Sequence, residues 1–155
     1  MTTDRHLGAL TAIGDTPLVA LDRVVPEGSA RVLMKLEWAN PTGSMKDRMA
    51  IAAVEAAATD GRLRPGGTIV EYTAGTTGIS LAFAGAALGY RTHIVFSDAF
   101  SDEKRRTMEA FGAEITIVPS DEGRINEALI NEMIRTADEI AERPGAWYCD
   151  QLRNH

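Results

Sequence analysis

Cysteine is almost absent from this sequence of 155 residues, which contains Cys149 alone. One thiol cannot form an intrachain disulfide or supply the thiolate cluster of a structural zinc site. Cys149 ends the apolar segment 146–149 (AWYC), which is typical of a buried strand. We therefore expect a packed core thiol rather than a reactive one, and no metal site.

Long apolar runs and an excess of basic charge are also absent. No stretch approaches the roughly 18 apolar residues of a membrane span, and the first residues lack the basic and apolar segments of a signal peptide. The formal net charge is -6, which disfavours binding to nucleic acid or to an anionic membrane. We expect a cytoplasmic protein that binds a small molecule, with neither nucleic acid nor membrane as a partner.

Short apolar segments alternate with segments of helical length from about residue 31 onward. Strands are predicted over residues 31–38, 68–72, 92–97, 114–119 and 147–150. Helices are predicted over residues 44–60, 77–88, 102–111 and 124–142, the last with Ile125, Leu129, Met133, Ala137 and Ile140 along one face. This alternation predicts an α/β fold with a parallel sheet and helices on both faces. Residues 1–30 lack the pattern and are interpreted as an arm that packs elsewhere.

Two segments are predicted to follow strands and to lead into helices, where ligands of open parallel sheets bind. In the first, Ser44 is expected to cap a helix, with Asp47 completing a variant of the capping box. Lys46 then falls in the first helical turn, where the helix dipole disfavours the ammonium form and favours an amine able to form an imine. Placement alone, however, is more typical of an ordinary solvated lysine.

The second segment is the glycine- and threonine-rich loop 73–78 (TAGTTG). Its hydroxyls and backbone N–H groups suit a carboxylate or a phosphate. The loop matches neither the dinucleotide fingerprint nor the P-loop pattern. By itself, it fits a plain turn nearly as well as an anion site.

Taken together, these segments resemble the cysteine synthase family of fold-type II pyridoxal-phosphate enzymes. Residues 13–18 (IGDTPL) resemble the family's I-G-N-T-P-L, and residues 35–48 (KLEWANPTGSMKDR) resemble K-x-E-x-x-N-P-x-x-S-x-K-D-R. The loop 73–78 falls where the family has T-S-G-N-T-G. Residues 111–114 (FGAE) and Gln151 followed by Asn154 also match in order and spacing. The resemblance runs from about residue 8 and corresponds to the N-terminal half of a family member.

The resemblance implies a tryptophan synthase beta-like fold and pyridoxal 5'-phosphate as the cofactor. Lys46 would bind the cofactor and act as the catalytic base, and Thr76 would contact the cofactor. The residues implied in binding the substrate carboxylate are Thr73, Ala74, Gly75, Thr77 and Gln151. The implied reaction is β-replacement or β-elimination on a serine- or cysteine-type amino acid. Ala74 and Thr76 replace a serine and an asparagine of the family, which leaves the exact substrate open.

Family members are about twice this length, so the resemblance also predicts a division of the chain. Residues 1–35 would be an arm belonging with a larger domain, 36–145 the small domain with the cofactor lysine, and 146–155 the start of the larger domain. The phosphate-binding loop would lie outside these residues. We therefore expect weak cofactor binding, little turnover by this chain alone, and an exposed apolar patch.

Several alternatives stay open. Full-length relatives would be homodimers, whereas this chain could instead pair with a complementary C-terminal chain. It could also be a non-catalytic fragment or an interaction module. An ammonia-lyase related to threonine dehydratase is a further alternative on the same fold. A nucleotide-binding Rossmann domain is the weakest alternative, because the glycine fingerprint is absent.

Overall fold

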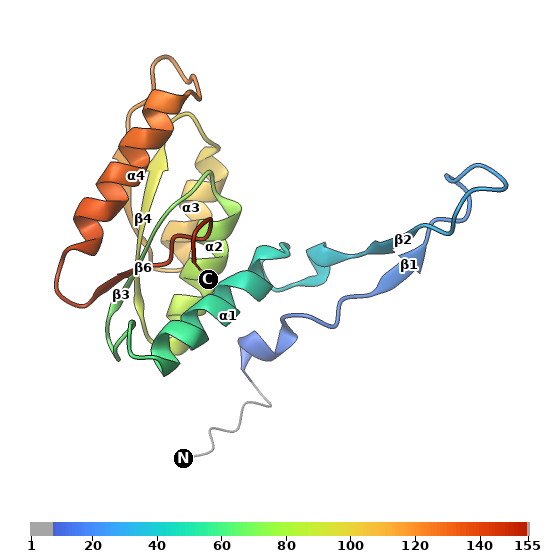
Figure 1. Cartoon of the computed structure of the whole chain (residues 1–155), viewed down its shortest axis with the longest axis horizontal. Coiled ribbons are helices and arrows are strands. Elements are labelled where there is room, and N and C mark those ends of the chain that lie inside the picture. Colours follow the sequence, from blue (N-terminus) through green and yellow to red (C-terminus); the bar gives the residue numbers. More distant parts are fainter. Residues whose placement is uncertain (1–7, 155) are drawn as a thin grey trace.

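The computed structural model describes residues 8–154, which form an α/β body and a projecting arm (Figure 1). The body contains a four-stranded parallel sheet in the order β5-β4-β3-β6. Its strands are β3 (Thr68–Tyr72), β4 (Arg91–Ser97), β5 (Glu114–Val118) and β6 (Ala146–Tyr148). Its helices are α1 (Lys46–Thr59), α2 (Thr76–Leu88), α3 (Asp102–Ala110) and α4 (Glu127–Ala141).

Helices cover both faces of the sheet, as the sequence predicts. On one face, α1 and α2 pack on β3 and β6, and α3 packs beside α2 on β4. On the other face, α4 packs across β3, β4 and β5. Every residue of β4 after Arg91 is buried, because a central parallel strand is covered from both sides. The α/β fold with helices on both faces is confirmed. Among the described helices, none has both the length and the apolar character needed to cross a bilayer.

Helix α4 is amphipathic, but it begins three residues later than predicted. Leu129, Met133, Ala137 and Ile140 are buried at helical spacing. Asn126 ends the preceding loop, and its side chain accepts a hydrogen bond from the Leu129 N–H at 2.9 Å. This cap fixes the start of the helix. Ile125 therefore lies before the helix and is 60% exposed, so its predicted place on the buried face was wrong.

The predicted strand over residues 31–38 does not join the parallel sheet. Only Leu33–Lys35 forms a strand, β2, which pairs antiparallel with β1 (Leu18–Ala20) in the arm. The position beside β3 is taken by β6 instead. All three residues of β2 are exposed, so no buried face holds this strand to the body. The three-part division of the chain stays a prediction, although β6 completes the four-stranded sheet.

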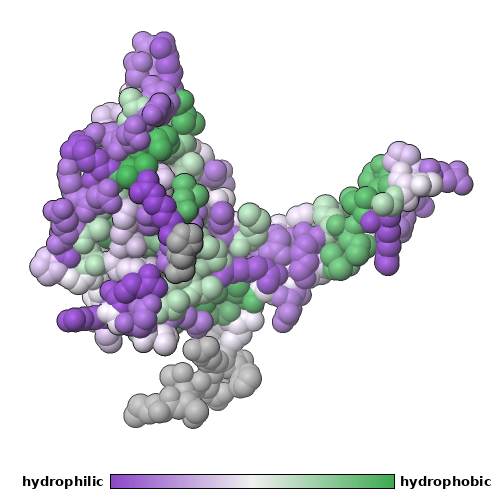
Figure 2. Space-filling model, viewed as in Figure 1, coloured by the Kyte–Doolittle hydropathy of each residue, from purple (hydrophilic) through white to green (hydrophobic). Residues whose placement is uncertain are grey.

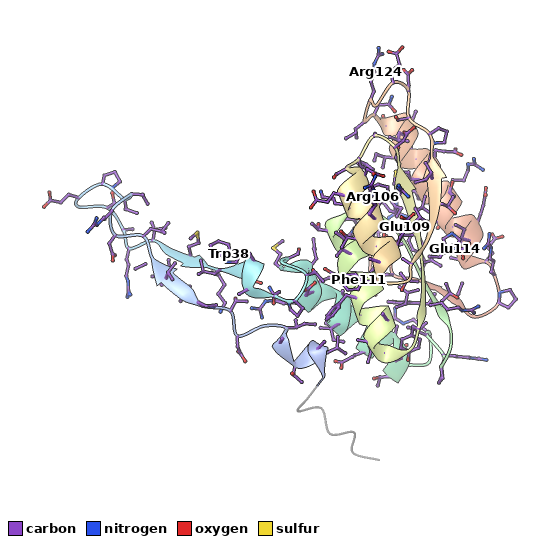
Figure 3. All side chains as sticks on the ribbon, turned by 180° about the vertical axis from the view of Figure 1, so that it is seen from behind. Trp38, Arg106, Glu109, Phe111, Glu114 and Arg124 are labelled. Atoms are coloured by element: carbon purple, nitrogen blue, oxygen red, sulfur yellow. The ribbon has the colours of Figure 1, made fainter. Side chains whose placement is uncertain are left out.

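The arm exposes much apolar surface along β1, β2 and their connection (Figure 2). A short 3-10 helix, η2 (Ala9–Ala12), precedes the arm, and η3 (Glu37–Ala39) joins it to the body. Trp38, in η3, is 64% exposed and lies where the arm meets the body (Figure 3). The exposed apolar residues of the arm are Leu18, Val24, Val32, Leu33, Met34 and Trp38. The expected apolar patch is confirmed, and a surface of this kind is typical of an interface.

Candidate active site

Lys46 is the first residue of α1, and the loop before it is tightly turned. The Gly43 N–H donates to the Asn40 carbonyl at 2.8 Å, and the Lys46 N–H donates to Ser44 Oγ at 3.1 Å. The Lys46 side chain is half-buried. Its amine makes no hydrogen bond or ion pair with the rest of residues 8–154. The loop thus presents an unpaired primary amine at the start of a helix.

Asp47 fastens this loop to α2 rather than completing a capping box. The Asp47 side chain is buried, and its Oδ2 accepts the Thr42 N–H at 2.8 Å. Its Oδ1 accepts the Thr42 hydroxyl at 2.5 Å and the Ser80 hydroxyl at 2.6 Å. The predicted capping-box bond to the Ser44 N–H was wrong, because the carboxylate reaches the preceding turn and the neighbouring helix. The residue after Lys46 therefore fixes the lysine loop against α2.

Glu37 and Arg48 join the lysine loop to the arm. The Arg48 guanidinium donates to both Glu37 carboxylate oxygens, at 2.9 and 3.1 Å. Thr16 donates to the same carboxylate at 2.7 Å, and Asn40 accepts the Gly14 N–H at 2.9 Å. The hydrogen bond from Arg48 is the main reason why the pKa of Glu37 falls to about 2. The motif residues Glu37, Asn40 and Arg48 thus have a structural role that the sequence alone did not reveal.

The loop 73–78 brings its hydroxyl and glycine residues to the first turn of α2. Thr73 and Thr77 are buried, whereas Ala74 and Thr76 are exposed. Thr73 Oγ1 accepts the Gly75 N–H at 3.0 Å. Gly75 has φ of 141°, and a Cβ at this position would lie 2.2 Å from Cδ of Lys104. The positive φ favours glycine here, and a larger residue would also displace the Lys104 side chain of α3. Lys104 was missed, because no motif pointed to it.

Gln151 joins this loop from a distant part of the sequence. The Thr77 hydroxyl donates to Gln151 Oε1 at 2.6 Å, across 74 residues of sequence. The structure therefore brings Thr73, Gly75, Thr77 and Gln151 together. Thr76, at the start of α2, makes no hydrogen bond to Lys46 within the described residues. The binding roles of all these residues stay predictions.

A buried acid and a buried thiol lie under the turn that carries Gln151. Glu71 of β3 is fully buried, and its carboxylate accepts the Tyr72 and Gln151 N–H groups, each at 3.0 Å. Burial raises the pKa of Glu71 to about 7. Cys149 is fully buried, and burial, together with nearby Glu71, raises the pKa of its thiol to about 12. Cys149 is thus the packed thiol that was expected. Glu71 was missed, although an acid within the apolar strand TIVEY was a usable signal.

A separate cavity lies at the end of the sheet where the strands begin. It opens between the amino ends of the strands and the end of α4, and Arg91, His93, Glu114 and Arg143 contribute to its lining. Burial lowers the pKa of His93, whose Nε2 lies 2.8 Å from Thr116 Oγ1. None of its lining residues belongs to α1 or to the loop 73–78. This cavity therefore contains none of the predicted site residues.

One family model and several known proteins are similar to this chain. The family model described as "Pyridoxal-phosphate dependent enzyme" matches residues 9–155. Similar proteins include a cysteine synthase of Staphylococcus aureus (strain N315), 42% identical over 142 residues, and a probable cysteine synthase of Bacillus subtilis (strain 168), 43% identical over 143 residues. Each alignment covers 92% of this chain and 44% of the relative. The crystal structure of O-ureido-L-serine synthase has a TM-score of 0.85 and 40% identity, covering 96% of this chain and 45% of that one.

Proposed function

Because the chain belongs to the family of pyridoxal-phosphate dependent enzymes, we propose that it provides the lysine-bearing half of a cysteine synthase-like enzyme. The reaction is β-replacement or β-elimination on a serine- or cysteine-type amino acid. Relatives named cysteine synthase and O-ureido-L-serine synthase support this choice, since both names describe the synthesis of an amino acid with a heteroatom on Cβ. The observation that carries the proposal is the unpaired amine of Lys46 at the start of α1.

The residues present fit the aldehyde end of pyridoxal phosphate. A primary amine that is half-buried and free of hydrogen-bond partners can form an imine with an aldehyde. Thr76, exposed at the start of α2, offers a hydroxyl to the cofactor. Bound there, the cofactor supplies an electron sink for negative charge on the substrate Cα. Lys46 would hold the cofactor, and its free amine would remove the Cα proton.

The remaining residues would bind and orient the substrate. The loop from Thr73 to Thr77 ends at the N-terminus of α2, where backbone N–H groups and the helix dipole favour a carboxylate. Gln151 borders the loop through its hydrogen bond with Thr77. Asp47 keeps the lysine loop fixed against α2. The position of the Lys46 amine relative to the loop 73–78, which would bind the substrate carboxylate, therefore stays constant. Such fixed placement is a major source of rate enhancement.

The chain spans about 44% of the length of the curated relatives it matches. We therefore propose that contacts to the cofactor phosphate come from residues outside this sequence, either in a longer chain or in a complementary C-terminal chain. Weak cofactor binding and little turnover are expected from the 155 residues alone. A homodimer and a cytoplasmic location are part of the same proposal.

The proposal can be tested by trapping the cofactor on the protein. The sequence contains only three lysines, Lys35, Lys46 and Lys104, so borohydride reduction after incubation with pyridoxal phosphate, followed by peptide mass spectrometry, can distinguish every site. We expect one main adduct, on Lys46, that is lost in Lys46→Ala. Lys104→Ala is the matched control, since the Lys104 amine also lacks a hydrogen-bond partner among the described residues. Equal modification of all three lysines in the wild type, with the Lys35 and Lys104 adducts unchanged in Lys46→Ala, would refute a cofactor site.

A second candidate function is an interaction module without catalysis. The exposed apolar surface of the arm favours this function, because such a surface is typically buried against a partner. Co-expression with the C-terminal half of a relative separates the two functions. A complex that gains β-replacement activity supports the enzyme, whereas a complex without turnover supports the module. A panel that includes threonine would also reveal the ammonia-lyase alternative through release of ammonia.

A further inference from the structure

The buried carboxylate of Glu71 has no cation as a partner within residues 8–154. Glu71 is fully buried in β3, on the face covered by α1 and α2. Its Oε1 accepts the Tyr72 N–H and its Oε2 accepts the Gln151 N–H, each at 3.0 Å. An unpaired buried carboxylate is costly, and an apolar residue would cost less at this place in a core. The role of this carboxylate is therefore sought in its two hydrogen bonds to backbone N–H groups.

The hydrogen bond to Gln151 lies where β6 leaves the sheet. The Cys149 N–H still bonds the Val70 carbonyl at 2.9 Å, in line with the parallel pairing of β3 and β6. Two residues later, the Gln151 N–H bonds the Glu71 side chain instead of the main chain. Between them, Asp150 has φ of 41°, a left-handed conformation that is uncommon outside glycine. The Glu71 carboxylate thus holds a turn that the sheet itself no longer supports.

Gln151 connects this turn to the loop that would bind the substrate. Its backbone is held by Glu71, and its side chain accepts the Thr77 hydroxyl at 2.6 Å. We propose that Glu71 is a positioning residue that holds Gln151 against Thr77 and thereby shapes the site for the substrate carboxylate. The identity of the ligand rests on the proposed function, whereas the positioning itself does not require the cofactor.

The titration of Glu71 gives this arrangement a measurable signature. Burial raises its pKa to about 7, so the charge that strengthens both hydrogen bonds is lost as the pH falls through neutrality. Helix α2 contributes no charged residue to this face. The titratable and charged groups around it are Tyr72, Tyr148, Cys149, Asp150 and Arg153, with Arg62 near Cys149, and, in the first turn of α1, Lys46, Asp47 and Arg48. The pKa values of both tyrosines and of Cys149 are raised, which moves them further from neutrality.

The test is NMR of the full chain labelled with nitrogen-15. Glu71→Met keeps a side chain of similar size and removes both acceptors, and Glu71→Gln restores one. Glu142→Gln, at an exposed position at the end of α4, is the matched control. In the wild type, we expect a contact between the Gln151 side chain and the Thr77 methyl group, and a Gln151 amide resonance that titrates near pH 7. In Glu71→Met, we expect the contact and the titration to disappear and the Gln151 N–H to exchange about tenfold faster, as loss of one hydrogen bond implies.

Glu71→Gln should give an intermediate exchange rate and no titration, and Glu142→Gln should match the wild type. A Gln151 side chain that stays against Thr77 in Glu71→Met would overturn the inference. Lys46 modification by pyridoxal phosphate, measured on the same samples, keeps the two proposals apart. A Lys46 adduct with an unmoved Gln151 would refute the positioning role alone. A displaced Gln151 without any specific Lys46 adduct would refute the proposed function alone.

Discussion

Replacement of Asp47 tests whether its hydrogen bonds hold the lysine loop in place. Asp47→Ala removes the acceptor for the Thr42 N–H, the Thr42 hydroxyl and the Ser80 hydroxyl. The change leaves Lys46 itself untouched. Any effect on the modification of Lys46 would therefore report the position of the loop.

The size of the effect follows from these three contacts. Hydrogen bonds to a charged group contribute about 1.5–3 kcal/mol each, so their sum is an upper bound. The Thr42 and Ser80 hydroxyls lie 3.4 Å apart and can turn toward each other when the carboxylate is removed. Only the Thr42 N–H then lacks an acceptor. The unfavourable free energy of burying the Asp47 charge is also removed, which offsets part of the loss. We expect Asp47→Ala to lower the free energy of unfolding by about 3 kcal/mol and Asp47→Asn by about 1 kcal/mol.

Urea unfolding followed by circular dichroism measures the stability of each variant, and borohydride trapping measures modification of Lys46. Asp22→Asn is the control, because Asp22 is exposed and its side chain has no hydrogen bond or ion pair among the described residues. Asp47→Ala should slow specific modification of Lys46 under conditions in which the variant is folded. A change in unfolding free energy below about 0.5 kcal/mol, the range of ordinary surface substitutions, would refute the reasoning.

Two further predictions concern the buried parts of the site. The raised pKa of Glu71, from 4.5 to about 7, means that the folded state retains a proton that the unfolded chain has lost. The free energy of unfolding should therefore fall by about 3 kcal/mol as the pH rises from about 4.5 to 7. Urea unfolding at several pH values measures this dependence, and Glu71→Gln should remove the part that Glu71 contributes. The same pH dependence in the wild type and in Glu71→Gln would contradict the prediction. Gly78→Ala places a Cβ 2.4 Å from Met108 Sδ and 2.7 Å from Thr73 Cγ2. It should cost about 1–3 kcal/mol in thermal or urea unfolding, whereas Gly8→Ala, with open space around it, should be neutral.

The sequence alone determined the class of fold, the family and the two segments of interest. Helix and strand periodicity are local properties, so the body helices were predicted within three residues and the sheet strands within two, apart from the strand over 31–38. The lysine segment and the threonine-rich loop are contiguous motifs, and for that reason they could be compared directly with the cysteine synthase family. Burial of Cys149 followed from its apolar neighbours.

Only the tertiary structure decided which of these segments meet. Alternating residues in 31–38 fit an arm as well as a central strand, and pairing with β1 settled the matter. The partners of Asp47 in α2 and of Thr77 at Gln151 lie 33 and 74 residues away. Local propensity contains no information about such contacts. They form because burial leaves each polar group with few possible partners, and packing of α1, α2 and β6 brings the right ones within reach.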